Sequence, residues 1–122
     1  MMGRESSLQD SVLSYLNKLP GCMAENVSGN ANQSGRPDIT GCYRGQMFKL
    51  ELKSPDDGNT TTLKQDIELR RWATAGCVVG VVYSMKALRK MFEWDWKAMR
   101  GYGRYNLRHS NGRVSWLLVP KR

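Results

Sequence analysis

A single α/β domain built around a mixed sheet is the fold class that this sequence predicts. The chain has 122 residues, a length that fits one compact domain and leaves no room for a second core of useful size. Its apolar residues follow helix-like and strand-like periods in the order α-β-β-β-α-β. The run 77–83 is apolar on both faces, which is typical of a central strand in a mixed or parallel sheet.

An amphipathic helix opens the chain and is expected to end before Pro20. Its apolar residues recur at helical spacing, and Ser6 with Gln9 is expected to form a capping box at its start. A short strand is expected over 22–27. The following residues, 28–35, are rich in Gly, Asn, Gln and Ser and have no apolar period, which predicts a loop.

The middle of the chain predicts a β-hairpin followed by a helix. Strands are expected over 38–43 and 46–53, with Arg44-Gly45 at the turn between them. The run 54–59 is a dense turn signal, because it is built from Ser, Pro, Asp, Gly and Asn. A helix is then expected from about 61 to 75.

The C-terminal third adds elements beyond this core. One amphipathic helix is expected over 86–100, and the tail is expected to form a hairpin or an irregular segment that ends in a strand over 114–119. We therefore expect one domain over residues 1–122, with a core at about 5–84 and a basic extension at 85–122.

The positive charge of the chain is concentrated in that extension. The net charge is +8, from 19 basic and 11 acidic residues. Residues 1–85 hold nine of each sign, whereas residues 86–122 hold ten basic and two acidic residues. Tryptophans and tyrosines are interleaved with these basic residues, which suits a phosphate backbone with stacked bases. Nucleic acid is thus the first partner to consider, and a solvated basic face is the alternative.

Composition also excludes several classes of protein. The three cysteines are widely spaced and only one histidine, His109, could join them, so a zinc site is not expected. The N-terminus has no apolar stretch of the signal-peptide kind, and no apolar run approaches the ~20 residues of a membrane helix. We expect no membrane partner and a location in the reducing cytoplasm.

The expected hairpin places two carboxylates together. If its turn centres on Arg44-Gly45, Asp38 faces Glu51, with Cβ atoms about 4.5 to 5.5 Å apart. Lys53 lies two residues along the same strand, on the same face. Like charges opposed in a sheet cost stability, so a compensating cation is needed. Lys53 supplies part of that charge, and a divalent metal such as Mg²⁺ would supply the rest.

A plain surface is the alternative interpretation of the same face. In that case Lys49 and Lys53 merely balance Asp38 and Glu51 as exposed pairs, each worth less than ~1 kcal/mol. Charges that alternate with apolar residues along a strand usually have this meaning. The order of the elements and the spacing between Asp38 and Glu51 favour the metal site.

Two motif pieces within this element order resemble the PD-(D/E)XK nuclease superfamily. They are Pro37-Asp38 and, after twelve intervening residues, Glu51-Leu52-Lys53. The short form between Gly35 and Gly76 is most similar to the stand-alone virus-type replication-repair (VRR-NUC) branch. The resemblance covers roughly residues 5–84. It implies a restriction-endonuclease-like core with a mixed sheet flanked by helices, followed here by the basic extension.

The resemblance also implies a set of site residues. Asp38 and Glu51 would ligate Mg²⁺ or Mn²⁺, together with the backbone carbonyl of Leu52. Lys53 would position or activate the attacking water. Gln65, on the following helix, would help to hold the water or the lysine.

Two of the candidate residues have a second interpretation. Gln65 with Thr62 also forms the pattern of a capping box, and the two roles are compatible. Glu5 is a candidate metal ligand from the first helix, or an N-terminal charge that favours the helix dipole.

The expected function is a metal-dependent DNA endonuclease of phage-type replication or repair, with branched DNA and Holliday junctions among the candidate substrates. Arg36, Arg100, Arg104 and Arg108 are the candidate contacts to nucleic acid. A twofold homodimer is expected, because a branched junction needs two symmetric incisions. The alternative is a non-catalytic basic nucleic-acid-binding module on a nuclease-like fold.

Overall fold

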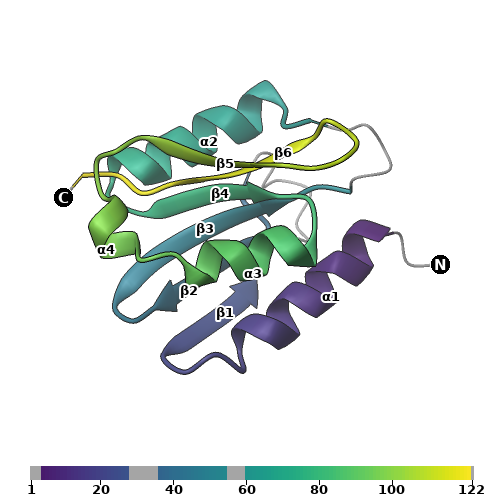
Figure 1. The fold of residues 1–122 in the computed structure, drawn as a ribbon, viewed down its shortest axis with the longest axis horizontal. Coiled ribbons are helices and arrows are strands. Elements are labelled where there is room, and N and C mark those ends of the chain that lie inside the picture. The colour runs from purple at the N-terminus through teal and green to yellow at the C-terminus, as the bar shows by residue number, and fades with distance from the viewer. Residues whose placement is uncertain (1–3, 28–35, 55–59, 122) are drawn as a thin grey trace.

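The computed structural model describes residues 4–27, 36–54 and 60–121, and it confirms the predicted mixed α/β architecture. A six-stranded sheet of order β1-β2-β3-β4-β6-β5 carries helices on both faces (Figure 1). The strands are β1 (Cys22–Asn26), β2 (Ile39–Tyr43), β3 (Gln46–Leu52), β4 (Val78–Val82), β5 (Arg104–Arg108) and β6 (Val114–Leu118). The helices are α1 (Arg4–Leu16), α2 (Leu63–Thr74), α3 (Met85–Glu93) and α4 (Trp96–Met99). The loop predicted over 28–35 and most of the turn predicted over 54–59 lie outside the described residues.

The β2–β3 hairpin has the predicted register. Ile39 lies opposite Leu50, at the end of the ladder farthest from the turn. Both central residues of the turn have left-handed backbone, with φ of 49° at Arg44 and 85° at Gly45. This combination matches the twist of two strands joined by a two-residue loop. The local chemistry of the turn therefore sets which side chains of β2 and β3 share a face.

The alternation of residues along β3 divides the hydrophobic core between the two faces of the sheet. Phe48, Leu50 and Leu52 pack on one face against α1 and α3. On the other face, α2 packs over β4 through contacts that include Leu69 and Val81. Strand β4 is buried along its whole length, as its apolar sequence predicted. The odd-numbered residues of β3 consequently face the α2 side of the sheet.

Two helix boundaries differ from the sequence-based prediction. Helix α1 begins at Arg4, so Ser6 does not mark its start. The single helix predicted over 86–100 is divided into α3 and the short α4. Trp94 has extended backbone with ψ of 146°, and the carboxylate of Asp95 caps the start of α4. Asp95 is a favoured N-cap residue, because its side chain accepts a hydrogen bond from the backbone N–H of Ala98, which has no partner within the helix.

The C-terminal segment extends the same sheet. Strand β6, which matches the strand predicted over 114–119, pairs antiparallel with β4, and β5 pairs antiparallel with β6. The β5–β6 turn therefore lies at the end of the sheet where β3 and β4 finish (Figure 1). In the described part of the chain, every helix is too short or too polar to cross a membrane.

Candidate active site

Asp38 stands just before β2, beside the last residues of β3. Its Oδ2 accepts a hydrogen bond of 2.9 Å from the backbone N–H of Leu52. Its position is one residue beyond the pair formed by Ile39 and Leu50, so Asp38 and Glu51 are cross-strand neighbours. The backbone contact uses one carboxylate oxygen, and Oδ1 accepts no hydrogen bond from any residue in the described ranges.

Glu51 is the more deeply buried of the two carboxylates, with 2% of its surface exposed. Its Oε2 accepts a hydrogen bond of 3.0 Å from Nε2 of Gln65, the third residue of α2. A buried carboxylate needs polar partners, because its charge is otherwise very costly away from water. The amide of Gln65 meets part of that need and fixes how Glu51 is oriented.

Gln65 forms the capping box that its sequence position predicts, and it also contacts Glu51. The capping box is present: the N–H of Gln65 donates to Oγ1 of Thr62 at 3.1 Å, and the N–H of Thr62 donates to Oε1 of Gln65 at 2.9 Å. The other end of the same amide donates to Glu51. The cap therefore holds the side chain at the position from which it reaches the sheet.

Two lysines on this face of β3 have different surroundings. Lys49 is 7% exposed, and its Nζ lies 3.9 Å from the centre of the Trp72 ring. Desolvation lowers the pKa of Lys49 below its ordinary value. Lys53 is 8% exposed and follows the end of β3, where its backbone N–H donates to the carbonyl of Val82 at 2.9 Å. Lys49 thus packs on α2, whereas Lys53 stands at the end of β3, directly after Leu52.

This burial contradicts the interpretation of the face as a solvated surface with exposed ion pairs. Lys49, Glu51 and Lys53 are all buried on the face of the sheet on which α2 packs. The signal that sequence reasoning missed is Trp72, which lies in the last turn of α2 and supplies the aromatic partner for Lys49.

The candidate nucleic-acid contacts fall into two groups. Arg104 and Arg108 are exposed on β5, on either side of Asn106. Across the sheet, Asn106 pairs with Trp116, Trp116 pairs with Val81, and Val81 pairs with Glu51. Arg104 and Arg108 therefore share the face of the site. Arg36 is half-buried in the segment just before Asp38.

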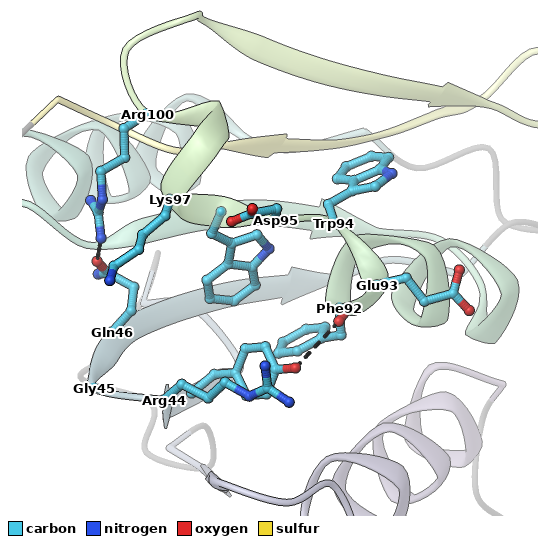
Figure 2. Close-up of a pocket in the computed structure, with 11 residues that line it drawn as sticks. Arg44, Gly45, Gln46, Phe92, Glu93, Trp94, Asp95, Lys97 and Arg100 are labelled. Atoms are coloured by element: carbon cyan, nitrogen blue, oxygen red, sulfur yellow. Dashed lines mark hydrogen bonds between the residues drawn. The ribbon is translucent and has the colours of Figure 1, made fainter.

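Arg100 lies elsewhere, in a cavity of about 540 Å³ at the turn end of the β2–β3 hairpin. Figure 2 shows its guanidinium directed at Gln46 within this cavity, to which it donates a hydrogen bond. A second nitrogen of the guanidinium donates to the carbonyl of Pro120. Arg100 is thus tied to other parts of the protein, at the opposite end of the hairpin from Asp38.

The chemistry of the donors at the site fits a hard divalent cation. Two carboxylates and a backbone carbonyl are oxygen donors of the kind that Mg²⁺ and Mn²⁺ take while they keep several waters. In the described ranges, no group of three or more His, Cys, Asp or Glu side chains converges on a metal position. The side chain of Glu5, in the first turn of α1, lies outside what the structure describes.

No protein-family model and no curated protein sequence matches the chain. A solved structure described as a VRR_NUC domain matches with a TM-score of 0.62 and 26% sequence identity, over 75% of this chain and 97% of that domain. The motif pieces, the element order and this match agree. The chain has the nuclease-like fold of a VRR-NUC domain, with a mixed sheet of the restriction-endonuclease-like kind flanked by helices.

Proposed function

We propose that this chain is a metal-dependent DNA endonuclease that hydrolyses phosphodiester bonds. The observation that supports the proposal is the cross-strand position of Asp38 relative to Glu51 at the end of β3, where Lys53 follows directly in the chain and Gln65 of α2 is bonded to Glu51. Two carboxylates and an ammonium group beside one another are the groups that hydrolysis of a phosphodiester needs at neutral pH.

Each residue has a chemical role in this proposal. Asp38, Glu51 and the backbone carbonyl of Leu52 would hold Mg²⁺ or Mn²⁺, and Glu5 is a further candidate ligand. Such an ion, when bound, lowers the pKa of a coordinated water and stabilises negative charge on the phosphate. The ammonium group of Lys53 orients the attacking water and stabilises the charge that develops as it attacks. Gln65 is a positioning residue that orients Glu51.

DNA is the proposed substrate because of the charge that surrounds the site. Arg104 and Arg108 present positive charge on the same sheet face as Glu51, and Arg36 lies beside Asp38. Contacts of this kind bind phosphates without regard to sequence. A substrate recognised by its branched shape, such as a junction, is consistent with that mode of binding.

Cleavage of labelled DNA tests the proposal directly. Linear duplex, flap and four-way junction substrates are incubated with the protein in Mg²⁺, in Mn²⁺ and in EDTA. We expect cleavage with either metal and none in EDTA. Binding without cleavage of any substrate in either metal would instead assign the chain to the alternative class, a nucleic-acid-binding module on a nuclease-like fold.

A homodimer is part of the proposal, because symmetric incision of a junction needs two sites. Light scattering at micromolar concentration distinguishes a dimer from the 13.9 kDa monomer. Junction cleavage by a species of monomer mass would overturn the dimer mechanism while leaving the nuclease assignment intact.

A further inference from the structure

We propose that a cavity beside the active site is a binding subsite for a nucleotide of the DNA strand next to the scissile phosphate. We call it the hairpin subsite. It lies between the residues that precede α2 and the tip of the β5–β6 hairpin, and its volume is about 250 Å³. Its polar and aromatic lining includes Thr60, Thr61, Tyr83, Arg113 and Trp116. The inference rests on the proposed nuclease function, which it deepens by assigning substrate contacts outside the site itself.

The register of the sheet places this cavity next to the site. Glu51 pairs with Val81, Val81 pairs with Trp116, and both partners line the cavity. Adjacent strands are about 4.8 Å apart, so the lining begins roughly 5 Å from the Glu51 strand and continues to roughly 10 Å. DNA rises about 3.4 Å per nucleotide, so the cavity is within about three nucleotides of a phosphate held at the site.

The cavity lies where the pairing of β4 with β6 ends. Their ladder finishes at the pair of Val81 and Trp116. Beyond it, the backbone N–H of Tyr83 donates to Oγ of the fully buried Ser115 at 3.0 Å, so a side chain replaces the next ladder bond. Val81, Trp116 and Tyr83, which surround this end of the ladder, all line the cavity.

The chemistry of the lining suits a nucleotide. Arg113 supplies a guanidinium, whose planar donors match a phosphate. Thr60 and Thr61 stand on the other side of the cavity; the hydroxyl of Thr61 donates to Asp66, and Thr60 is exposed. The half-buried ring of Trp116 offers an apolar surface of the kind on which a base or sugar packs.

Hydrogen bonds within the tip of the β5–β6 hairpin hold its backbone in place. The carbonyl of Arg113 accepts from the N–H of His109 at 2.7 Å, and its own N–H donates to Oδ1 of Asn111 at 3.0 Å. The ring of His109 is also bonded to Ser115, with 2.6 Å between Nε2 and Oγ. Arg113 is therefore presented on a fixed backbone, which reduces the entropy lost on binding.

The arginines of the β5–β6 hairpin are available to bind phosphate. After Asp95 the chain contains no acidic residue. Among the residues that the structure describes, Arg104, Arg108 and Arg113 form no salt bridge. Arg104 stacks on Trp116, with 4.9 Å from its guanidinium carbon to the ring centre, so the ring joins the subsite to the basic face of β5.

The first test needs no variant protein. Each phosphate of a cleavable strand is replaced in turn by an uncharged methylphosphonate, and wild-type cleavage rates are compared. We expect a loss of about tenfold or more at a phosphate within about three nucleotides of the cut, and the next test distinguishes this phosphate from those that Arg104 and Arg108 contact. Uniform rates at every position except the scissile phosphate would overturn the subsite.

The second test assigns that phosphate to Arg113. Arg113→Gln is compared with Lys90→Gln, which removes the same charge from an exposed position on α3, on the opposite face of the sheet. We expect Arg113→Gln to slow cleavage of the all-phosphate strand by about tenfold and to abolish the effect of the methylphosphonate. Lys90→Gln should change neither. Retention of the methylphosphonate effect in a folded Arg113→Gln protein would overturn the assignment.

The two proposals fail in different ways. If the wild-type protein cleaves no DNA in either metal, the proposed function is wrong and the subsite is wrong with it. If the wild-type protein cleaves but shows no neighbouring phosphate that matters, the nuclease assignment stands and the subsite alone is wrong.

Discussion

The two ends of the β2–β3 hairpin carry charged residues beside buried strands, but they differ in what those residues contact. At the turn end, Arg100 is bonded to Gln46 and to the carbonyl of Pro120, beside a cavity of about 540 Å³. At the open end, Asp38 accepts a hydrogen bond from the N–H of Leu52, Glu51 accepts one from the amide of Gln65, and Lys53 follows directly after β3.

The aromatic residues at the turn end explain the difference. Trp96 packs against Phe92 and Tyr43, with ring centres 5.0 and 5.4 Å apart, and its indole N–H donates to the carbonyl of Met91. These rings join α3 and α4 to the sheet and belong to the hydrophobic core. We therefore place the proposed chemistry at the carboxylates that face each other across the strand register, and not at this cavity.

The largest expected effect is on cleavage at the open end. Lys53→Ala removes the ammonium group beside the carboxylates and should lower the cleavage rate by about 10²- to 10⁴-fold while leaving DNA binding largely intact. Asp38→Asn and Glu51→Gln should do the same, because each removes charge that holds the metal. Lys97→Ala, the same change as Lys53→Ala but at the turn end, should cleave normally. Equal losses of cleavage rate in Lys53→Ala and Lys97→Ala would contradict the placement of the chemistry at the open end.

A smaller effect on cleavage is expected from two variants that distinguish the capping role of Gln65 from its hydrogen bond to Glu51. Gln65→Ala removes both the capping box and the hydrogen bond to Glu51, so it should cost about 1 kcal/mol of stability and slow cleavage by about tenfold. Thr62→Ala weakens the same cap but leaves the amide of Gln65 in place, so it should lower the melting temperature alone. Equal cleavage rates in the two variants would show that Gln65 acts only on the helix.

The salt dependence of DNA binding sharpens the comparison further. Arg104→Ala and Arg108→Ala should each reduce the slope of log affinity against log salt by about 0.9 for each lost phosphate contact. Arg100→Ala should lower the melting temperature and leave the slope unchanged, because its guanidinium is already bonded within the protein. A fall in slope for Arg100→Ala would restore this residue to the DNA contacts that its sequence position suggested.

The smallest expected effect concerns Lys49. Burial lowers its pKa in the folded protein, so between that lowered value and its ordinary value of 10.5 the unfolded chain binds more protons than the folded one. Stability should therefore rise with pH across this alkaline window. Lys49→Met should flatten the rise in unfolding free energies measured at several pH values. A slope identical to that of the wild type would show that Lys49 keeps its ordinary pKa beside Trp72.

Local rules determined much of the fold and the geometry of the candidate site. The period-two alternation of 46–53 and the Arg44-Gly45 turn predict a register, and that register makes neighbours of Asp38 and Glu51. The capping pattern of Thr62 likewise placed Gln65 in the first turn of α2. Such features are predictable because turn chemistry, strand alternation and capping act within a few residues of one another.

Tertiary structure decided the rest, because contacts between segments distant in sequence depend on how whole elements dock. Lys49 and Lys53 occupy equivalent positions in the alternation of β3, and only the docking of α2 gave Lys49 the ring of Trp72. Arg100 and Arg104 are both basic residues of the extension, yet one is tied to the turn end and the other lies on the face of the site. That division follows from the long-range pairing of β6 with β4, which no local pattern encodes.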